Sequence, residues 1–202
     1  IANDRTLYAW GVTGYSATTP TYLMPLTPDV SNYKQVESGF DFTVFLKTDG
    51  SIWTMGDNSA GVLGVGDFNN RSSPTQVGTS SWTQIAAGQS QIFAIRADGA
   101  LYAWGQGASG ALGNGSTANA NSPVPIGTSS WTALAGQSAA IRIDGRLFAW
   151  GPNTNGQLGD NTIVDKSSPV QIGTSSWTMA SFDRLGASVG ILTNGLLYAW
   201  GN

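Results

Sequence analysis

The residues of this chain that could take part in catalysis or metal binding are mostly carboxylates. Among 202 residues there are 12 Asp and Glu, and there is no histidine and no cysteine. Ser-His-Asp and Cys-His nucleophile systems, the usual zinc ligand sets and disulfides are therefore excluded. What remains is a pair of carboxyl groups about 5–10 Å apart across a cleft, which could hydrolyse a glycoside.

Turns explain most of these carboxylates better than catalysis does. Asp49, Asp98 and Asp144 each precede a glycine, and such pairs are typical of type I′ hairpin turns. Other carboxylates lie in or beside glycine-rich segments, where they cap backbone amides. The residues of this second group that could offer oxygen ligands to calcium are Asp57-Asn58, Asp160-Asn161 and Asp165. None of them has the spacing of a full calcium-binding loop. We therefore expect no enzyme activity, no metal site and no cofactor, with a carboxylate-pair hydrolase as an alternative.

The aromatic residues are the second group that could bind a ligand, because tryptophans can form a platform for sugars or bases. Seven of the 8 tryptophans recur at two fixed positions of a repeated pattern, which predicts that they pack the repeats together: Trp10, Trp104, Trp150 and Trp200 at one position, and Trp82, Trp131 and Trp177 at the other. Tyr15, Tyr22 and Phe68 lie outside the repeated positions, in long connecting segments. These three are the candidate contacts with a ligand or partner; the alternative is that they fold onto the edge of a repeat.

The pattern itself is a repeat of one short strand. LYAWG occurs at residues 7–11, 101–105 and 197–201, with close copies at 52–56 and 147–151, so that successive steps are 45, 49, 46 and 50 residues. Before each later copy come a proline, a strand that begins with Trp-Thr or an equivalent pair, another apolar strand and an Asp-Gly or Asn-Gly turn. Each unit therefore offers about four short strands in a meander, without helical periodicity. Such a unit buries its apolar face against its neighbours.

This order of motifs resembles the regulator of chromosome condensation repeat in its bacterial form. The residues that carry the match are Trp82–Gly88, Asp98-Gly99, Trp104-Gly105, Gly110–Gly113, Ser122-Pro123 and Gly156–Asp160. The resemblance implies an all-β propeller of four-stranded antiparallel blades, commonly seven in this family. We expect one repeat domain over 1–202 with about four units and a partial unit at each end, the units being 7–51, 52–100, 101–146 and 147–196.

The number of strands predicts an arc of a larger ring, of about seven blades. There are five copies of the LYAWG strand and four of the Trp-Thr strand, so four equal blades would leave one strand over. The chain would then be a segment of a longer propeller chain, or an arc that further copies or another chain complete. The alternative is a four-bladed ring with one redundant strand outside it.

Two units depart from the pattern. Trp131 lies 13 residues before Asp144, whereas Trp82 lies 16 before Asp98. This predicts a shorter middle hairpin in the third unit, with the loss in its turn, because an odd deletion within a strand would reverse its faces. The first unit lacks the Gly-x-Leu-Gly turn, and Met55 stands at the tryptophan position of the strand that follows.

The composition of the chain argues against some classes of function. A net charge of −3 and nine scattered Lys and Arg argue against nucleic acid, and no apolar run approaches the ~18–20 residues of a membrane span. The leading prediction is a non-enzymatic binding or structural module, extracellular or on a virus particle, that contacts protein or glycan through its blade-connecting loops. The alternative is a cytoplasmic regulator of another protein, similar to the family's founder. The founder's guanine-nucleotide exchange activity is not expected, because the face of the founder that carries it contains histidine and this chain has none.

Overall fold

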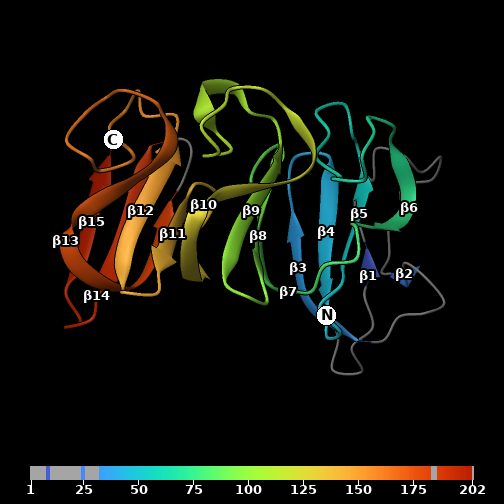
Figure 1. Cartoon of the computed structure of the whole chain (residues 1–202), viewed down its shortest axis with the longest axis horizontal. Coiled ribbons are helices and arrows are strands. Elements are labelled where there is room, and N and C mark those ends of the chain that lie inside the picture. The colour runs from blue at the N-terminus through green and yellow to red at the C-terminus, as the bar shows by residue number, and fades with distance from the viewer. Residues whose placement is uncertain (1–7, 10–23, 26–31, 183–185, 202) are drawn as a thin grey trace.

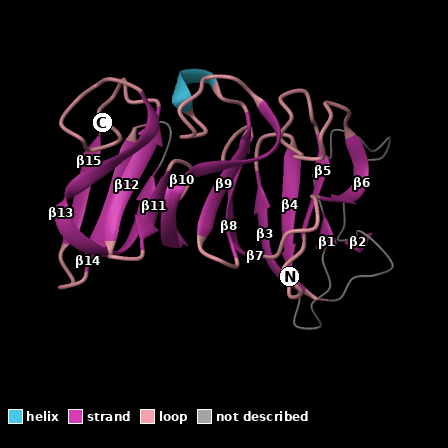
Figure 2. Cartoon of the chain, in the orientation of Figure 1, coloured by secondary structure: helices cyan, strands magenta, loops and turns pink. Residues whose placement is uncertain are grey.

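The computed structural model of the chain describes residues 8–9, 24–25, 32–182 and 186–201, and nearly all regular structure in them is antiparallel β-sheet (Figures 1 and 2). One short 3-10 helix, η1 (Ala108–Gly110), lies in a loop. The strands are β1 (Tyr8–Ala9), β2 (Met24–Pro25), β3 (Tyr33–Ser38), β4 (Phe42–Lys47), β5 (Ile52–Gly56), β6 (Arg71–Gln76), β7 (Trp82–Ala87), β8 (Gln91–Arg96), β9 (Ala100–Gly105), β10 (Ala120–Leu134), β11 (Ala139–Arg142), β12 (Arg146–Gly151), β13 (Lys166–Phe182), β14 (Ala187–Leu192) and β15 (Leu197–Gly201).

Strands β3 to β15 form four propeller blades, as the sequence predicts, and β1 pairs with β2 in a separate two-stranded sheet. Blade 1 is the sheet β3-β4-β5-β6, and a continuous order of nine strands from β7 to β15 contains the other three. The order is continuous because β10 and β13 each leave one blade as its fourth strand and enter the next as its first: Val124 of β10 pairs with β9, while Trp131 of the same strand pairs with β11. Blade 2 is therefore β7 to early β10, blade 3 late β10 to early β13, and blade 4 late β13 to β15.

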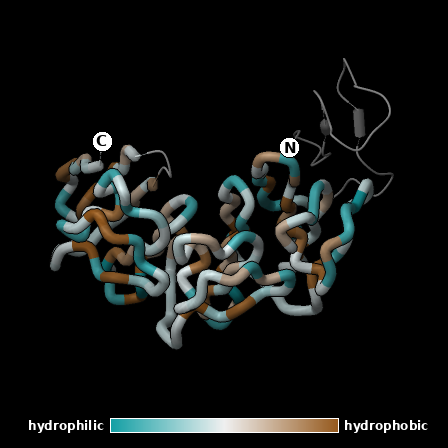
Figure 3. Tube along the Cα trace, turned by 90° about the horizontal axis from the view of Figure 1, so that it is seen from above, coloured by the Kyte–Doolittle hydropathy of each residue, from teal (hydrophilic) through white to brown (hydrophobic). Residues whose placement is uncertain are grey.

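Seen from above, the blades follow one another along an open arc, with blade 1 and blade 4 at its ends (Figure 3). A closed ring of four blades is therefore not the arrangement of the described residues. The apolar core lies between neighbouring blades. For example, Val44 and Leu46 of blade 1 belong to one buried cluster with Trp82, Ile85 and Trp104 of blade 2. The repeated tryptophans of the described residues thus pack blade on blade, which confirms the interpretation of their recurrence; Trp10 lies outside those residues.

The Asp-Gly hairpins form, but the predicted turn type is wrong. A type I′ turn needs positive φ at both central residues, whereas at the first hairpin Gly50 has a φ of 85° and Asp49 does not have a positive φ. The Lys47 N–H donates to the Ser51 carbonyl (2.9 Å), which closes a three-residue loop. The Asp49 carboxylate accepts the Ser51 N–H (2.8 Å). This local hydrogen bond explains the preference for Asp before the glycine.

The middle hairpin of blade 3 is shorter, as predicted, but the loss is not in its turn. Trp131 still pairs with Arg142 at the base of the hairpin, and the turn now runs from Ala135 to Ala139, where blade 2 has Gly88–Gln91. Each arm has lost two residues and the turn has gained one. An even loss in each arm keeps every side chain on its own face, so the blade still packs normally on its neighbours.

Candidate functional site

One face of the arc carries the long loops, and we call it the loop face. It consists of the turns between the first and second strands of each blade and the loops that follow the third strands, 57–70, 106–119 and 152–165. Backbone hydrogen bonds tie the two sets together: the Asp57 N–H donates to the Asp41 carbonyl (2.8 Å) and the Gln106 N–H to the Ser90 carbonyl (2.9 Å). In Figure 1 this face lies at the top, and the Asp-Gly turns lie at the bottom.

Buried asparagines hold two of these loops in fixed shapes. Asn153 is fully buried; its Nδ2 donates to Asp160 Oδ1 (3.0 Å), and its Oδ1 accepts the Leu158 N–H (3.0 Å). Asn58 occupies the same place in the blade 1 loop and accepts the Leu63 N–H (2.9 Å). These two loops of the loop face are therefore held by their own internal hydrogen bonds.

The carboxylates that the sequence assigns to turns do occupy turns. On the face opposite the loop face, Arg96 forms a two-nitrogen ion pair with Asp98, with Nη2 2.6 Å from Oδ2. Hydrogen bonds from Arg96 lower the pKa of Asp98 to about 2, and Arg142 does the same for the pKa of Asp144. In the loops, Asp160 pairs with Lys166 at 3.2 Å.

Within the described ranges, no three Asp or Glu side chains gather as a metal site would require. The same part of the chain has no helix of the length and hydropathy needed to cross a bilayer.

A hollow of about 370 Å³ opens where the first strands of the four blades converge. Two glutamines on its wall join neighbouring blades. Gln84 of blade 2 donates from Nε2 to the Thr132 carbonyl (2.7 Å) and accepts the Leu134 N–H (3.1 Å), both in blade 3. Gln35 of blade 1 donates to the Ile85 carbonyl of blade 2 (2.8 Å). These hydrogen bonds join blade 1 to blade 2 and blade 2 to blade 3 beside the hollow.

Glu37 and Gln137 are two of the polar residues that line the hollow. The Gln35 amide donates to one carboxylate oxygen of Glu37 (3.1 Å) and so orients it. Gln137 lies in the turn of the shortened hairpin, and its buried Oε1 has no hydrogen-bond partner among the described residues. A backbone bridge between Gly136 and Phe182 joins this turn to blade 4. The shortened hairpin therefore leaves a carbonyl oxygen unsatisfied at the meeting point of three blades.

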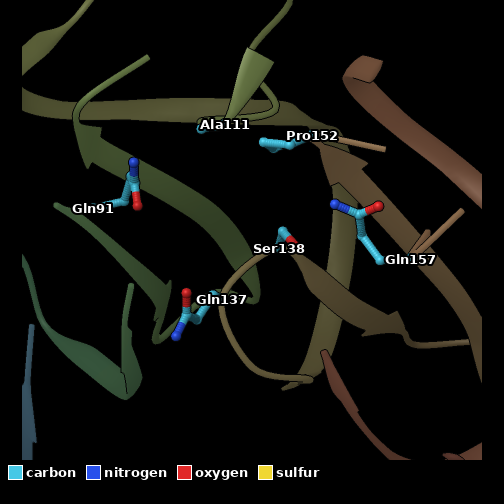
Figure 4. A pocket seen from close by; sticks show the side chains of 6 residues that line it. All are labelled: Gln91, Ala111, Gln137, Ser138, Pro152 and Gln157. Carbon is cyan, nitrogen blue, oxygen red and sulfur yellow. The ribbon is translucent and has the colours of Figure 1, made fainter. Parts of the chain in front are cut away.

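Gln137 also lines a narrow crevice on the other side of its turn (Figure 4). Its volume of about 10 Å³ is close to the minimum for one water molecule. Gln91 and Gln157, both buried, line it with Gln137. The hollow is therefore the larger candidate for a ligand or partner.

Of the three aromatic contacts predicted from the sequence, Tyr15 and Tyr22 lie outside the described residues. Phe68 lies in the blade 1 loop on the loop face with 53% of its surface exposed, and it does not line the hollow. Its contact with a ligand or partner stays a prediction.

Sequence reasoning missed other exposed apolar side chains on this face: Phe40 at 83%, Ile163 at 70% and Val164 at 60%. It also missed Gln137, although the deletion around it was visible.

The sequence matches the profile described as "Regulator of chromosome condensation (RCC1) repeat" at residues 49–95, 98–135 and 144–181, and a second profile of the same description at 33–62. No curated protein sequence matches the chain. Together the matched segments cover more than half of its residues.

Solved structures show the same fold. Human WBSCR16 superposes with a TM-score of 0.83 at 22% identity, over 98% of this chain and 57% of its own. Yeast RCC1 (Prp20), bound to Kap60, superposes with a TM-score of 0.81 at 19% sequence identity, over 98% of this chain and 52% of that structure's chain. A structure of Prp20p from Saccharomyces cerevisiae, described with its binding to Gsp1p and histones, has a TM-score of 0.76 at 19% identity, over 95% of this chain and 50% of that structure's chain. The chain thus spans about half the length of the structures it resembles.

Proposed function

The chain belongs to the regulator of chromosome condensation (RCC1) repeat family, and from that premise we propose that it is a non-enzymatic module that recognises another protein through its loop face. The setting we propose is extracellular or on a virus particle. Support for this setting comes from composition: only 10% of the residues are charged, with a net charge of −3.

The observation that carries the proposal is the set of apolar side chains exposed on the loop face. Phe40, Phe68, Ile163 and Val164 come from three different connections, in blades 1 and 3, and each is more than half exposed. Aromatic side chains such as the two phenylalanines are enriched in protein interfaces. Because buried asparagines hold two of the loops, binding would cost little conformational entropy.

The hollow supports the same proposal by its polarity. Glu37 is the charged residue of its wall. Its carboxylate is an acceptor, so it suits a donor from the partner, such as a lysine, arginine or amide side chain. Apolar contacts on the loop face would then supply affinity, and the hollow would select the side chain that enters it.

The relatives give support by analogy. Yeast Prp20 is described in complex with Kap60 and with binding to Gsp1p and histones. These are protein partners of a propeller with the same fold. We carry over only the class of partner, a protein surface.

The test compares variants of opposite faces. Proteins captured by the immobilised chain are purified. The Kd of each is then measured with the parent chain and with the variants Phe40→Ser, Ile163→Ser and Glu37→Gln. The control is Ile143→Ser, because Ile143 is as exposed as Ile163 (71% against 70%) but lies beside an Asp-Gly turn on the opposite face. We expect at least a tenfold weaker Kd for each loop-face variant and no change for the control. An equal loss in the control, or binding to a glycan array without any protein ligand, would overturn the proposal.

A further inference from the structure

The charged side chains of the described residues are divided unequally between the two faces of the arc. The loop face carries five aspartates, in the first turn of blade 1 and in the loops of blades 1 and 3: Asp41, Asp57, Asp67, Asp160 and Asp165. Its two cations, Arg71 and Lys166, are already paired with carboxylates of the same face, Asp67 and Asp160. Five carboxylates against two cations leave a net charge of −3 on this face, before Glu37 of the hollow is added.

The opposite face, which carries the Asp-Gly turns (Figure 1), has the reverse balance. Among the described residues its cations outnumber its carboxylates: Lys34, Lys47, Arg96, Arg142 and Arg146 against Asp49, Asp98 and Asp144. The Lys and Arg residues are therefore scattered along the sequence but not in the fold. A partner that approaches the loop face meets a negative potential, which favours a positively charged surface on that partner.

The opposite face also shows how this chain holds a cation. The Arg96 guanidinium lies 4.9 Å from the ring centre of Tyr102 and pairs with Asp98. Arg142 repeats the arrangement in blade 3, where it lies 4.7 Å from the ring centre of Phe148 and pairs with the aspartate of its turn. Each arginine is stabilised twice, because its planar cation stacks on the ring and donates hydrogen bonds to the carboxylate.

Phe40 and Asp41, in the first turn of blade 1 on the loop face, supply the same two components. Phe40 is 83% exposed, and Asp41 is exposed as well. The Asp57 N–H donates to the Asp41 carbonyl (2.8 Å), so a second acidic residue is fixed beside them. No Lys or Arg of the described residues pairs with Asp41 or lies over the Phe40 ring. Within that part of the chain, the ring and the carboxylate are thus in place without a cation.

We propose that the partner of the loop face is a basic protein segment, and that an arginine or lysine of this segment lies over Phe40 and pairs with Asp41. This inference rests on the proposed function, because it names the chemistry of the partner of the same face. The apolar stem of such a side chain covers the exposed ring while its charged head reaches the carboxylate. Glu37, in the hollow, offers a further carboxylate to the same segment.

The probe for the test is a fluorescently labelled nine-residue peptide of alternating arginine and glycine, titrated with the whole chain. A matched peptide carries citrulline in place of arginine, which keeps the shape of the side chain but not its charge. We expect the arginine peptide to bind, with a Kd that weakens as salt is added, and the citrulline peptide not to bind. Phe40→Leu, which keeps an apolar side chain but loses the aromatic ring, and Asp41→Asn should each weaken the Kd about two- to fivefold.

Asp49→Asn is the matched control, because it makes the same change of charge at an exposed aspartate of the opposite face. Its turn should be kept, since Asn194-Gly195 forms the equivalent turn of blade 4. We expect no change in Kd for this variant. Equal losses for Asp41→Asn and Asp49→Asn, equal binding of the two peptides, or no saturable binding of the arginine peptide would each overturn the inference.

The same variants separate this inference from the proposed function. With a protein captured by the chain, Phe40→Ser tests any contact of the loop face, whereas Phe40→Leu and Asp41→Asn test the contact with a cation. If only Phe40→Ser weakens the Kd of that protein, the loop face binds protein without a basic segment, and this inference alone fails. If Ile143→Ser weakens the Kd as much as Phe40→Ser does, the proposed function fails.

Discussion

Gly113, in the loop after the third strand of blade 2, lies directly against the indole ring of Trp150 in blade 3. A Cβ atom on Gly113 would be 2.7 Å from Cγ and Cδ1 of that ring. Gly64 stands in the same relation to Trp104. The last glycine of the Gly-x-Leu-Gly turn and the tryptophan of the next LYAWG strand are therefore two halves of one contact between blades.

Gly113→Ala should destabilise the fold by about 2–4 kcal/mol, from overpacking against the indole together with a strained positive φ of 70°. Urea unfolding followed by tryptophan fluorescence measures the change. Gly127→Ala is the control, because Gly127 has a φ of 61° and nothing within 4 Å of the added Cβ. Gly127→Ala should lower the free energy of unfolding only by the cost of the strained backbone, about 1–2 kcal/mol. Equal losses at the two glycines would show that the contact with Trp150 is unimportant.

Trp150→Met should partly rescue Gly113→Ala. The rescue is expected because the smaller, flexible side chain can move away from the new Cβ, and Met55 already occupies the corresponding position in blade 1. In a double-mutant cycle on unfolding free energies, we expect a coupling of about 1 kcal/mol or more. Strict additivity would mean that Gly113 and Trp150 do not constrain each other.

Much of the fold could be predicted from the sequence, because each unit repeats its turn signals and apolar positions. The Gly113–Trp150 contact could not, although both residues were visible in repeated motifs. Recurrence shows that a residue serves the unit, but not which residue of the neighbouring unit it touches. One hint was present: the unit without a Gly-x-Leu-Gly turn precedes the strand in which Met55 replaces tryptophan.

The candidate site was less predictable. A count of residues from Trp131 to Asp144 revealed a deletion but could not locate it, because strand pairing decides how a loss is divided between arms and turn. The exposure of the Gln137 turn to the hollow follows from that division. Phe40 and Ile163 gave no sequence signal, since an apolar residue in a turn can equally well fold inward.

Gln84→Ala should destabilise the chain by about 1–2 kcal/mol, because a carbonyl and an N–H of blade 3 lose their hydrogen-bond partner. Gln84 makes both bonds with one amide group. Gln76→Ala, at an exposed position on the outer strand β6, is the control and should be within 0.5 kcal/mol of the parent, about the usual range for surface changes. Equal unfolding midpoints for the two variants would contradict a role for Gln84 in joining blades 2 and 3.

The ion pair between Arg96 and Asp98 should make stability depend on pH in the acid range. Hydrogen bonds from Arg96 lower the pKa of Asp98 to about 2 in the folded chain, against about 3.9 for an unperturbed Asp. The unfolded state therefore binds more protons between these values, and the free energy of unfolding falls as pH falls from about 4 to about 2. Asp98→Asn removes this contribution, so the difference in stability between parent and variant should shrink between pH 5 and pH 2.5. Urea unfolding at each pH measures it, and Arg96→Gln should remove the same pH dependence. Parallel curves for parent and Asp98→Asn over this range would show that the pair does not lower the pKa of Asp98 in the folded chain.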